Sequence, residues 1–456
     1  MFLTSINPAT GETIAHYDEM SDETVSALID EGHSAWQAWR RTAIAERAAP
    51  LRNAARLLHE RKRDYAELMA REMGKPLDQG EAEIEKCAWV CDYYADNAES
   101  FLSPQVIESD ASKSYVAFEP LGVVLAVMPW NFPFWQLFRF LAPALMAGNG
   151  GILKHASNVQ GCALAIEQLV RDAGFPSDLF RVALVGSGQV EAMIAHPKIV
   201  AVTLTGSTDA GKAVAAVAGK HLKKTVLELG GSDPYLILED ADLDAATTTC
   251  VNARLLNSGQ SCIAAKRFIV VDAVRRRFEA LFVSKMRKQK MGDPLADGAI
   301  DLGPQARTDL RDELHAQVTA SVEAGARLLC GGVVPAGAGA FYPPTVLTDV
   351  TPGMAAYDEE LFGPVAAIIP VADEAEAIRV ANDSLFGLGA AVFTQDVARG
   401  ERIAREELHA GSCFVNGLVK SDPRLPFGGV KQSGYGRELS AFGIREFVNI
   451  KTVWVG

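Results

Sequence analysis

The sequence predicts an α/β protein with two doubly wound domains and a small β flap, and three observations carry this expectation. Continuous apolar runs such as Gly122–Met128 alternate with segments of helical periodicity, as expected for parallel strands covered by helices on both faces. Glycine or polar residues stand where these runs end, as at Gly206 and Ser207. The 456 residues suffice for two or three structural units of about 100–200 residues each.

The composition excludes several classes of function. Hydrophobic residues make up 48% of the chain and charged residues 22%, as in ordinary globular proteins. The net charge of −13 argues against nucleic acid as the main partner, because such a partner favours a basic face. No apolar run approaches the ~20 residues that cross a bilayer, and residues 1–8 lack the features of a secretion signal. The seven cysteines, an odd number without zinc-ligand spacing, suit a reducing compartment, so we expect a cytoplasmic protein without a metal.

The first part of the chain is predicted to be a hairpin followed by helices. Asn7–Glu12 has turn chemistry between two short apolar stretches. Apolar residues then recur at helical spacing over residues 22–100. Residues 112–119 change to period two, which predicts a strand with one apolar face.

Strands and helices then alternate in two successive units. Buried strands are predicted at 122–128, 150–154, 180–185 and 199–205, with helices at 136–146, 159–173 and 209–218. This order is typical of a doubly wound nucleotide-binding sheet, whose ligand lies at the carboxyl ends of the strands. A second unit follows Pro234, with strands predicted at 235–238, 267–271 and 412–416 and helices at 243–256, 274–290 and 311–324.

These elements suggest the domain boundaries. We expect a cofactor-binding domain over 1–101 and 121–229, a catalytic domain over 230–425, and a β flap over 102–120 and 426–456. Phe447–Trp454 is extended and half apolar, and such a strand edge invites pairing with another subunit. We therefore expect a homodimer or homotetramer.

A cysteine and a carboxylate are the candidate reactive groups. Cys262 closes the short loop Asn257–Cys262, and Glu228 stands just before a glycine pair. A thiolate can attack a carbonyl carbon, while a carboxylate can act as the general base that accepts the proton. Taken alone, Cys262 is more often a buried small hydrophobe, and Glu228 a solvated charge at a strand end.

The glycine-rich segments do not match a standard phosphate loop. Gly186-x-Gly188 lacks the third glycine of the dinucleotide fingerprint, because Glu191 stands there. Gly206–Lys212 has the first seven positions of an ATPase phosphate loop, but Ala213 replaces the hydroxyl residue that binds magnesium. A phosphate-loop NTPase is therefore a weak alternative, although Gly206 and Ser207 can still place N–H groups near a pyrophosphate.

Six motifs in order along the chain resemble the aldehyde dehydrogenase superfamily, and within it the bacterial succinate-semialdehyde dehydrogenases of the Sad type. The motifs are Met128–Pro133, Leu204–Ser207, Glu228–Gly231, Gly259–Cys262, Glu360–Pro364 and Pro426–Lys431. The resemblance implies that Cys262 is the nucleophile and forms a thiohemiacetal with the aldehyde. It also implies that Asn131 joins the Cys262 backbone N–H in an oxyanion hole, and that Glu228 is the base for thioester hydrolysis. Without the resemblance, Asn131 would be interpreted as a turn residue between Trp130 and Phe132.

The resemblance also implies a cleft for NAD or NADP. The cofactor-binding residues that it implies are Met128, Trp130, Asn131, Lys154, His155, Ala156, Ser157, Gly186, Gly206, Ser207, Leu229, Gly230, Glu360 and Phe362. Ser157 is informative, since members that strongly prefer NAD often carry a glutamate there, whose charge repels a 2′-phosphate. With serine at this position and Lys154 nearby, we expect both cofactors to be accepted. A packed, neutral imidazole is the favoured reading of His155.

The substrate is the least constrained part of the prediction. Arg139 lies where the resemblance places an arginine that grips the distal carboxylate of a semialdehyde, and Ser421 and Arg424 could add polar contacts. A second arginine is absent, because Leu256 stands in its place. The pattern favours a short aldehyde with a terminal carboxylate, with succinate semialdehyde first. The alternatives are a neutral aldehyde, with Arg139 merely structural, and a catalytically silent protein of this fold.

Overall fold

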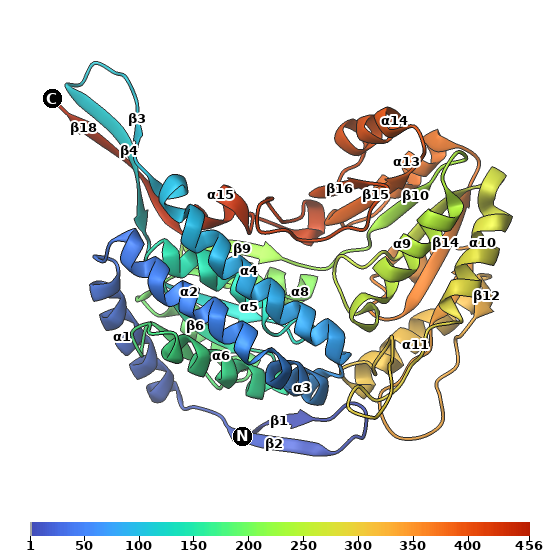
Figure 1. Ribbon diagram of the computed structural model, residues 1–456, viewed down its shortest axis with the longest axis horizontal. Coiled ribbons are helices and arrows are strands. Elements are labelled where there is room, and N and C mark those ends of the chain that lie inside the picture. The colour runs from blue at the N-terminus through green and yellow to red at the C-terminus, as the bar shows by residue number, and fades with distance from the viewer. Residues whose placement is uncertain (1) are drawn as a thin grey trace.

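The first α/β unit is built on a six-stranded sheet in this computed structural model, which describes residues 2–456 (Figure 1). The strand order is β17-β9-β8-β5-β6-β7, and all neighbours are parallel except β17, which is antiparallel to β9. The strands are β5 (Val123–Met128), β6 (Gly150–His155), β7 (Phe180–Val182), β8 (Ile199–Thr205), β9 (Lys224–Glu228) and β17 (Gly434–Tyr435). β5 is an almost wholly buried apolar run, as a strand with helices on both faces requires.

Helices surround this sheet, and capping residues fix where they begin and end. Ser21 caps the first helix by accepting from the Thr24 N–H, and Gly74 ends the third in a left-handed conformation with φ of 76°. The helices are α1 (Asp22–Trp39), α2 (Ile44–Glu60), α3 (Lys62–Met73), α4 (Leu77–Leu102), α5 (Trp135–Met146), α6 (Gln160–Asp172), α7 (Val190–Ala195) and α8 (Thr208–Lys220). The predicted hairpin is confirmed as β1 (Phe2–Ile6) and β2 (Thr13–Asp18), which lie along the lower side of this unit in Figure 1.

The second unit has a seven-stranded sheet in the order β12-β13-β14-β11-β10-β15-β16. All its neighbours are parallel except β12, which is antiparallel to β13. The strands are β10 (Pro234–Ile237), β11 (Arg267–Val271), β12 (Arg327–Cys330), β13 (Thr345–Thr348), β14 (Val365–Val371), β15 (Gly389–Phe393) and β16 (Ser412–Val415). Its α-helices are α9 (Leu243–Leu255), α10 (Asp272–Met286), α11 (Thr308–Glu323), α12 (Ala355–Asp358), α13 (Glu374–Asn382) and α14 (Val397–Arg402). The predicted fold class, two doubly wound units with a flap, is confirmed.

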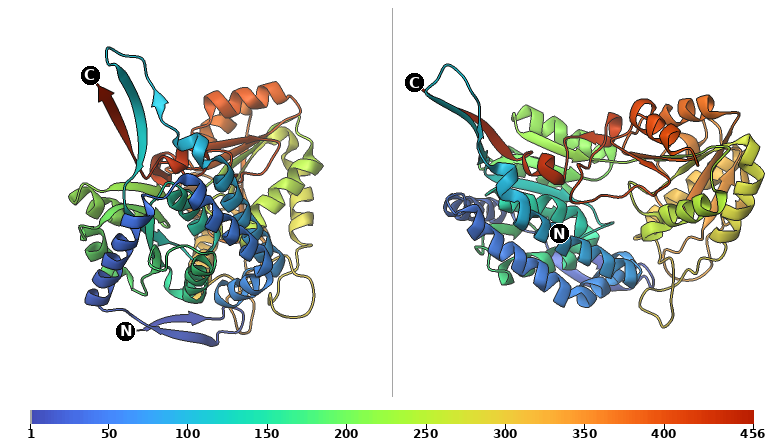
Figure 2. Two further views of the ribbon diagram at one scale, coloured as in Figure 1. Left: turned by 60° about the vertical axis from the view of Figure 1, so that its left-hand side comes forward. Right: turned by 45° about the horizontal axis from the view of Figure 1, so that its top comes forward.

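The flap is a three-stranded antiparallel sheet that projects from the body of the molecule (Figure 2). Its order is β18-β4-β3, with β3 at Gln105–Val106, β4 at Lys113–Pro120 and β18 at Val448–Val455. β18 has a neighbour on one side only, and Ile450 and Trp454 are more than half exposed. Within residues 2–456 the flap therefore offers a free strand edge with apolar side chains.

Only part of the segment 426–456, which the sequence analysis groups with the flap, belongs to the flap in the structure. Within residues 426–456, β17 pairs with β9 of the first unit, and α15 (Ser440–Ile444) contacts α4 and α5. Leu439 and Phe447 are buried in the core of that unit, which explains why only β18 joins the flap. No helix among the described residues is both long and apolar enough to cross a membrane.

Candidate active site

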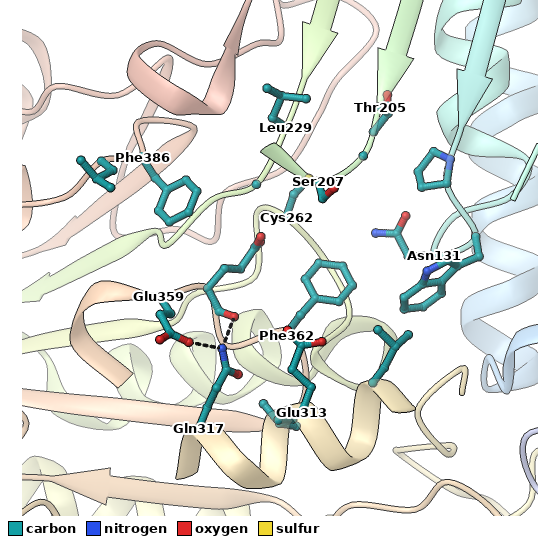
Figure 3. Close-up of a pocket in the computed structure, with 18 of the residues that line it drawn as sticks. Asn131, Thr205, Ser207, Leu229, Cys262, Glu313, Gln317, Glu359, Phe362 and Phe386 are labelled. Atoms are coloured by element: carbon teal, nitrogen blue, oxygen red, sulfur yellow. Dashed lines mark hydrogen bonds between the residues drawn. The ribbon is translucent and has the colours of Figure 1, made fainter. Parts of the chain in front are cut away.

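A cavity of about 480 Å³ contains the predicted nucleophile and lies where the two units meet (Figure 3). Nine predicted residues line it: Trp130, Asn131, Gly206, Ser207, Leu229, Gly230, Cys262, Glu360 and Phe362. Helix α11 contributes Glu313 and Gln317, which the sequence did not single out. The remaining predicted cofactor residues lie outside this lining, at Met128, Lys154, His155, Ala156, Ser157 and Gly186.

Cys262 is presented by a loop with an unusual backbone. Asn257, Ser258 and Gly259 all have positive φ, at 54°, 55° and 78°. A Cβ at Gly259 would stand 2.3 Å from the Gly363 carbonyl oxygen, so glycine is required there. Lys266 secures the other side of the loop, because its ammonium donates to the Cys262 carbonyl at 2.8 Å and the Ser261 carbonyl at 2.9 Å.

Cys262 lines the cavity, and the residue is half-buried. Burial raises the pKa of this thiol to about 12, while the positive charges of Arg139 and Lys266 act in the opposite direction. In this state the thiol is protonated at neutral pH, so attack on a carbonyl requires that its proton be removed.

Asn131 is positioned to offer one amide hydrogen to the cavity. Its Nδ2 donates to the Gln260 carbonyl at 3.1 Å, which uses one of the two amide hydrogens, and its side chain lines the cavity with Cys262. Its backbone carbonyl accepts from Asn257 Nδ2 at 2.7 Å. The loop of the nucleophile and the loop of the amide are therefore bonded directly to each other.

A buried ion pair that the sequence did not reveal supports Asn131. Lys75 Nζ donates to the Asn131 carbonyl at 2.9 Å and pairs with Glu83. The other oxygen of Glu83 accepts from the backbone N–H groups of Phe134 and Trp135, each at 2.9 Å. Both side chains are almost completely buried. The residues that meet here are about 50 positions apart in sequence, and no local sequence pattern predicts their contact.

Glu228 ends β9 and is buried rather than solvated. Only 2% of the residue is exposed, and neither carboxyl oxygen has a hydrogen-bond partner among the described residues. Burial raises the pKa of Glu228 well above its usual range, the nearby Glu438 carboxylate raises it further, and the Arg139 charge opposes both. A Cβ at Gly428, whose φ is 155°, would stand 2.7 Å from the Glu228 carboxyl oxygen. The solvated alternative for Glu228 is therefore wrong.

Several cavity residues can receive a dinucleotide. Ser207 caps α8 by accepting from the Ala210 N–H at 3.3 Å, so the positive end of a 13-residue helix faces the site. Glu360 accepts from the Gly231 N–H at 3.1 Å and lies 3.3 Å from Lys266. Trp130 and Phe362 meet edge to face with 5.7 Å between ring centroids.

The ATPase phosphate-loop alternative does not fit this structure. Helix α8 begins at Thr208, inside the matching segment, and Lys212 lies exposed on its surface. A phosphate-loop lysine must reach the bound phosphates, so a solvent-facing lysine argues against that chemistry.

The end of β6 carries the residues that were expected near the adenosine ribose. Lys154 is half-buried, and this burial lowers the pKa of its amine; it has no hydrogen-bond or ion-pair partner within residues 2–456. Ser157 is exposed and begins a short 3₁₀ turn, Ser157–Val159. His155 contacts the Pro133 carbonyl at 3.0 Å and accepts from the Ala156 N–H at 3.0 Å. Burial lowers the pKa of His155 to about 4, so its ring is neutral, as favoured from the sequence.

The three predicted substrate residues lie outside the cavity lining. Arg139 is 2% exposed, forms an ion pair with Glu438 and donates to Thr205 at 3.2 Å. The exposed Arg424 forms a two-bond pair with Asp422, at 2.9 and 2.7 Å. The Ser421 hydroxyl is buried and accepts from Lys86 Nζ at 2.8 Å and from the Trp135 indole N–H at 3.1 Å. The roles of all three toward a substrate stay predictions. Among the described residues no group of three or more His, Cys, Asp or Glu side chains could hold a metal ion.

A cysteine and an amide that share a cavity between two doubly wound units fit an enzyme of covalent carbonyl chemistry. Residues 2–453 match the aldehyde dehydrogenase family, and the chain belongs to that family. It is 50% identical over 455 residues to a probable NADP(+) succinate-semialdehyde dehydrogenase of Synechocystis, covering 100% of both chains. It is also 50% identical over 460 residues to the succinate-semialdehyde dehydrogenase [NADP(+)] of Mycobacterium avium, covering 100% of this chain and 97% of the relative. The crystal structure of succinic semialdehyde dehydrogenase from Streptococcus pyogenes in complex with NADP+ has a TM-score of 0.97, at 38% identity and 99% coverage of each chain.

Proposed function

We propose that the protein oxidises succinate semialdehyde to succinate and uses NADP, with NAD as a second acceptable cofactor. The full-length 50% identity to relatives named as NADP(+) succinate-semialdehyde dehydrogenases carries this proposal. The cavity supports the chemistry, because it joins a thiol, an amide and a helix N-terminus in one space.

In the acylation half of the reaction, the Cys262 thiol gives up its proton to solvent, and the thiolate adds to the aldehyde carbon and forms a thiohemiacetal. The free amide hydrogen of Asn131 and the Cys262 backbone N–H receive the developing oxyanion. One such donor stabilises the transition state by about 3–4 kcal/mol. When bound, the nicotinamide ring supplies the oxidant for this step. The carbon then remains on Cys262 as a thioester.

In the deacylation half, Glu228 takes a proton from the water that attacks the thioester. Its buried, unpartnered carboxyl has the raised pKa that suits a general base near neutral pH. Hydrolysis releases the acid and returns Cys262 to the thiol.

The residues around the cavity fit an NADP molecule. Lys154 is a half-buried cation without a partner among the described residues, and it would pair with the 2′-phosphate. Gly206 and Ser207 at the start of α8 would hold the pyrophosphate. Glu360 would hold the nicotinamide ribose, and Gly230 leaves space beside it, since a Cβ there would stand 2.5 Å from the Glu360 carboxylate.

A turnover assay tests this function. Purified protein is offered a panel of short aldehydes with NAD or NADP, and reduced cofactor is followed by absorbance. We expect the highest kcat/KM with succinate semialdehyde and no turnover in Cys262→Ala. Equal kcat/KM for succinate semialdehyde and butanal would reject the substrate, and turnover in Cys262→Ala would reject the mechanism.

We also propose that the protein is a cytoplasmic homodimer or homotetramer assembled through the flap. The free edge of β18 and its exposed Ile450 and Trp454 support pairing between subunits. All seven cysteines are free thiols, as suits a reducing compartment.

A further inference from the structure

A fully buried lysine lies behind the loop that carries the nucleophile. Lys266 is 1% exposed, and its ammonium donates to three backbone carbonyls, those of Ser261 at 2.9 Å, Cys262 at 2.8 Å and Ala264 at 3.2 Å. Its counter-charge is the Glu360 carboxylate, 3.3 Å away. Burying a charge is costly unless hydrogen bonds and a counter-charge compensate for it. So many contacts between one buried cation and one loop indicate that the orientation of the loop backbone matters.

The contact with Ser261 sets the direction of the Cys262 backbone N–H. The Ser261 carbonyl and the Cys262 N–H belong to one planar trans peptide unit, in which the C=O and the N–H point in opposite directions. Because the carbonyl points at the Lys266 ammonium, the N–H points away from it. Among the described residues this N–H has no hydrogen-bond acceptor. Its hydrogen is therefore free to receive an oxyanion on the cavity side of the loop.

The orientation of this peptide unit decides whether it helps or harms the reaction. If the unit turned over, its carbonyl oxygen would face the developing oxyanion and repel it, and the donor would be lost. One other contact holds the unit, because the Ala264 N–H donates to the Ser261 carbonyl at 3.1 Å. The Lys266 ammonium adds a charged donor to the same oxygen, which also polarises the peptide and strengthens its N–H as a donor.

We infer that Lys266 is a positioning residue for the oxyanion hole, which holds the Ser261–Cys262 peptide so that the Cys262 N–H is directed toward the cavity. The inference rests on the covalent chemistry of the proposed function and names the side chain that orients one of its two oxyanion donors. Asn131 supplies the other donor from the first unit, and Lys266 does not contact it.

A different role of the same lysine makes a different prediction. The Lys266 charge lowers the pKa of the Cys262 thiol, so a lysine that acted only on the thiol would speed every reaction of the thiolate alike. Iodoacetamide alkylates a thiolate and releases iodide without forming an oxyanion. Attack of the thiolate on p-nitrophenyl acetate passes through a tetrahedral oxyanion before p-nitrophenolate leaves. Neither reaction needs the cofactor, and the ratio of the acylation rate to the alkylation rate at one pH therefore reports the oxyanion hole.

The variant Lys266→Met tests the inference, because it removes the ammonium and keeps nearly the length of the side chain. Loss of a whole oxyanion donor lowers a rate by about 10²–10³-fold. The Ala264 N–H still holds the Ser261 carbonyl in the variant, so we expect the ratio of acylation to alkylation to fall roughly tenfold to a hundredfold. A ratio within about twofold of the wild type, whether both rates fall together or neither changes, would overturn the positioning role.

A matched lysine and a second variant keep the test decisive. Lys223 likewise donates to two backbone carbonyls, those of Ile194 and His196, and lines no part of the cavity. Lys223→Met should leave the ratio unchanged, and a fall as large as that in Lys266→Met would also overturn the role.

If Lys266→Met does not fold, the double variant Lys266→Met/Glu360→Gln removes both charges of the buried pair. The same fall in the ratio is expected, because neither reaction uses the cofactor that Glu360 would hold, and an unchanged ratio would refute the inference. The proposed function fails in a different way. Acylation that persists in Cys262→Ala would reject the covalent chemistry, and the inference with it.

Discussion

Replacing Lys75 by methionine should weaken both the folded state and the first chemical step. The Lys75 ammonium is fully buried between Glu83 and the Asn131 carbonyl, which it contacts at 2.9 Å. Methionine has nearly the same length and no charge, so Glu83 keeps only its backbone donors at Phe134 and Trp135. Removing one partner of a buried ion pair costs about 3–5 kcal/mol of stability.

The catalytic cost of Lys75→Met is set by Asn131. Complete loss of an oxyanion donor raises a barrier by about 3–4 kcal/mol. In Lys75→Met the amide is present but less firmly held, since Asn257 remains bonded to the Asn131 carbonyl at 2.7 Å. We therefore expect the acylation rate to fall roughly tenfold to a hundredfold, below that full loss.

Two measurements separate these effects. The burst of reduced cofactor in the first turnover reports acylation, and the midpoint of thermal unfolding reports stability. Lys75→Met/Glu83→Gln removes both charges and should recover much of the stability while acylation stays slow. Lys62→Met removes a surface lysine that pairs with Glu85 and should change neither quantity. Wild-type acylation in a folded Lys75→Met protein would refute the positioning role.

Three further outcomes are expected. In Glu228→Gln, a burst of reduced cofactor should precede slow turnover, because thioester hydrolysis loses its base. The rise of kcat with pH that the raised pKa of Glu228 produces, above the usual carboxyl range, should also flatten, and a steep rise retained in the variant would exclude this base. Ser157→Glu should weaken NADP roughly tenfold or more while NAD changes little, and an unchanged ratio of the two kcat/KM values would exclude Ser157 as the discriminator. Removing the residues after Arg445 deletes β18 and should give a smaller, less soluble species by light scattering, whereas the parent mass would exclude assembly through the flap.

Long apolar strands and their order were accessible from sequence, because their signal is strong and local. The predicted runs at 122–128 and 199–205 are confirmed as β5 and β8, nearly residue for residue. Strand β9, by contrast, was not identified. It has five residues with a charge at each end, so neither periodicity nor composition marks it, and its pairing with β8 decides its conformation.

The residues of the site also fall into two groups, those that a sequence motif indicates and those that only the fold reveals. Cys262 and Asn131 stand in recognisable motifs, and the cavity brings them together as expected. Lys75 was missed because the residue that it contacts, Asn131, lies 56 positions further along the chain. The partner that neutralises Arg139, Glu438, lies about 300 residues away in sequence and was equally hidden. What sequence cannot supply is the list of charges that are already paired in the folded protein.

The left-handed backbone of Asn257–Gly259, which precedes Cys262, depends on segments that are made both earlier and later in the chain. Asn257 donates to Asn131 in the first unit, and Gly259 packs against Gly363, about 100 residues downstream of Cys262. Three successive residues in this conformation are costly to hold without surrounding contacts. Until residue 363 has been made and the two units have docked, the loop therefore lacks the contacts that hold this conformation, so the geometry around Cys262 exists only in the complete fold.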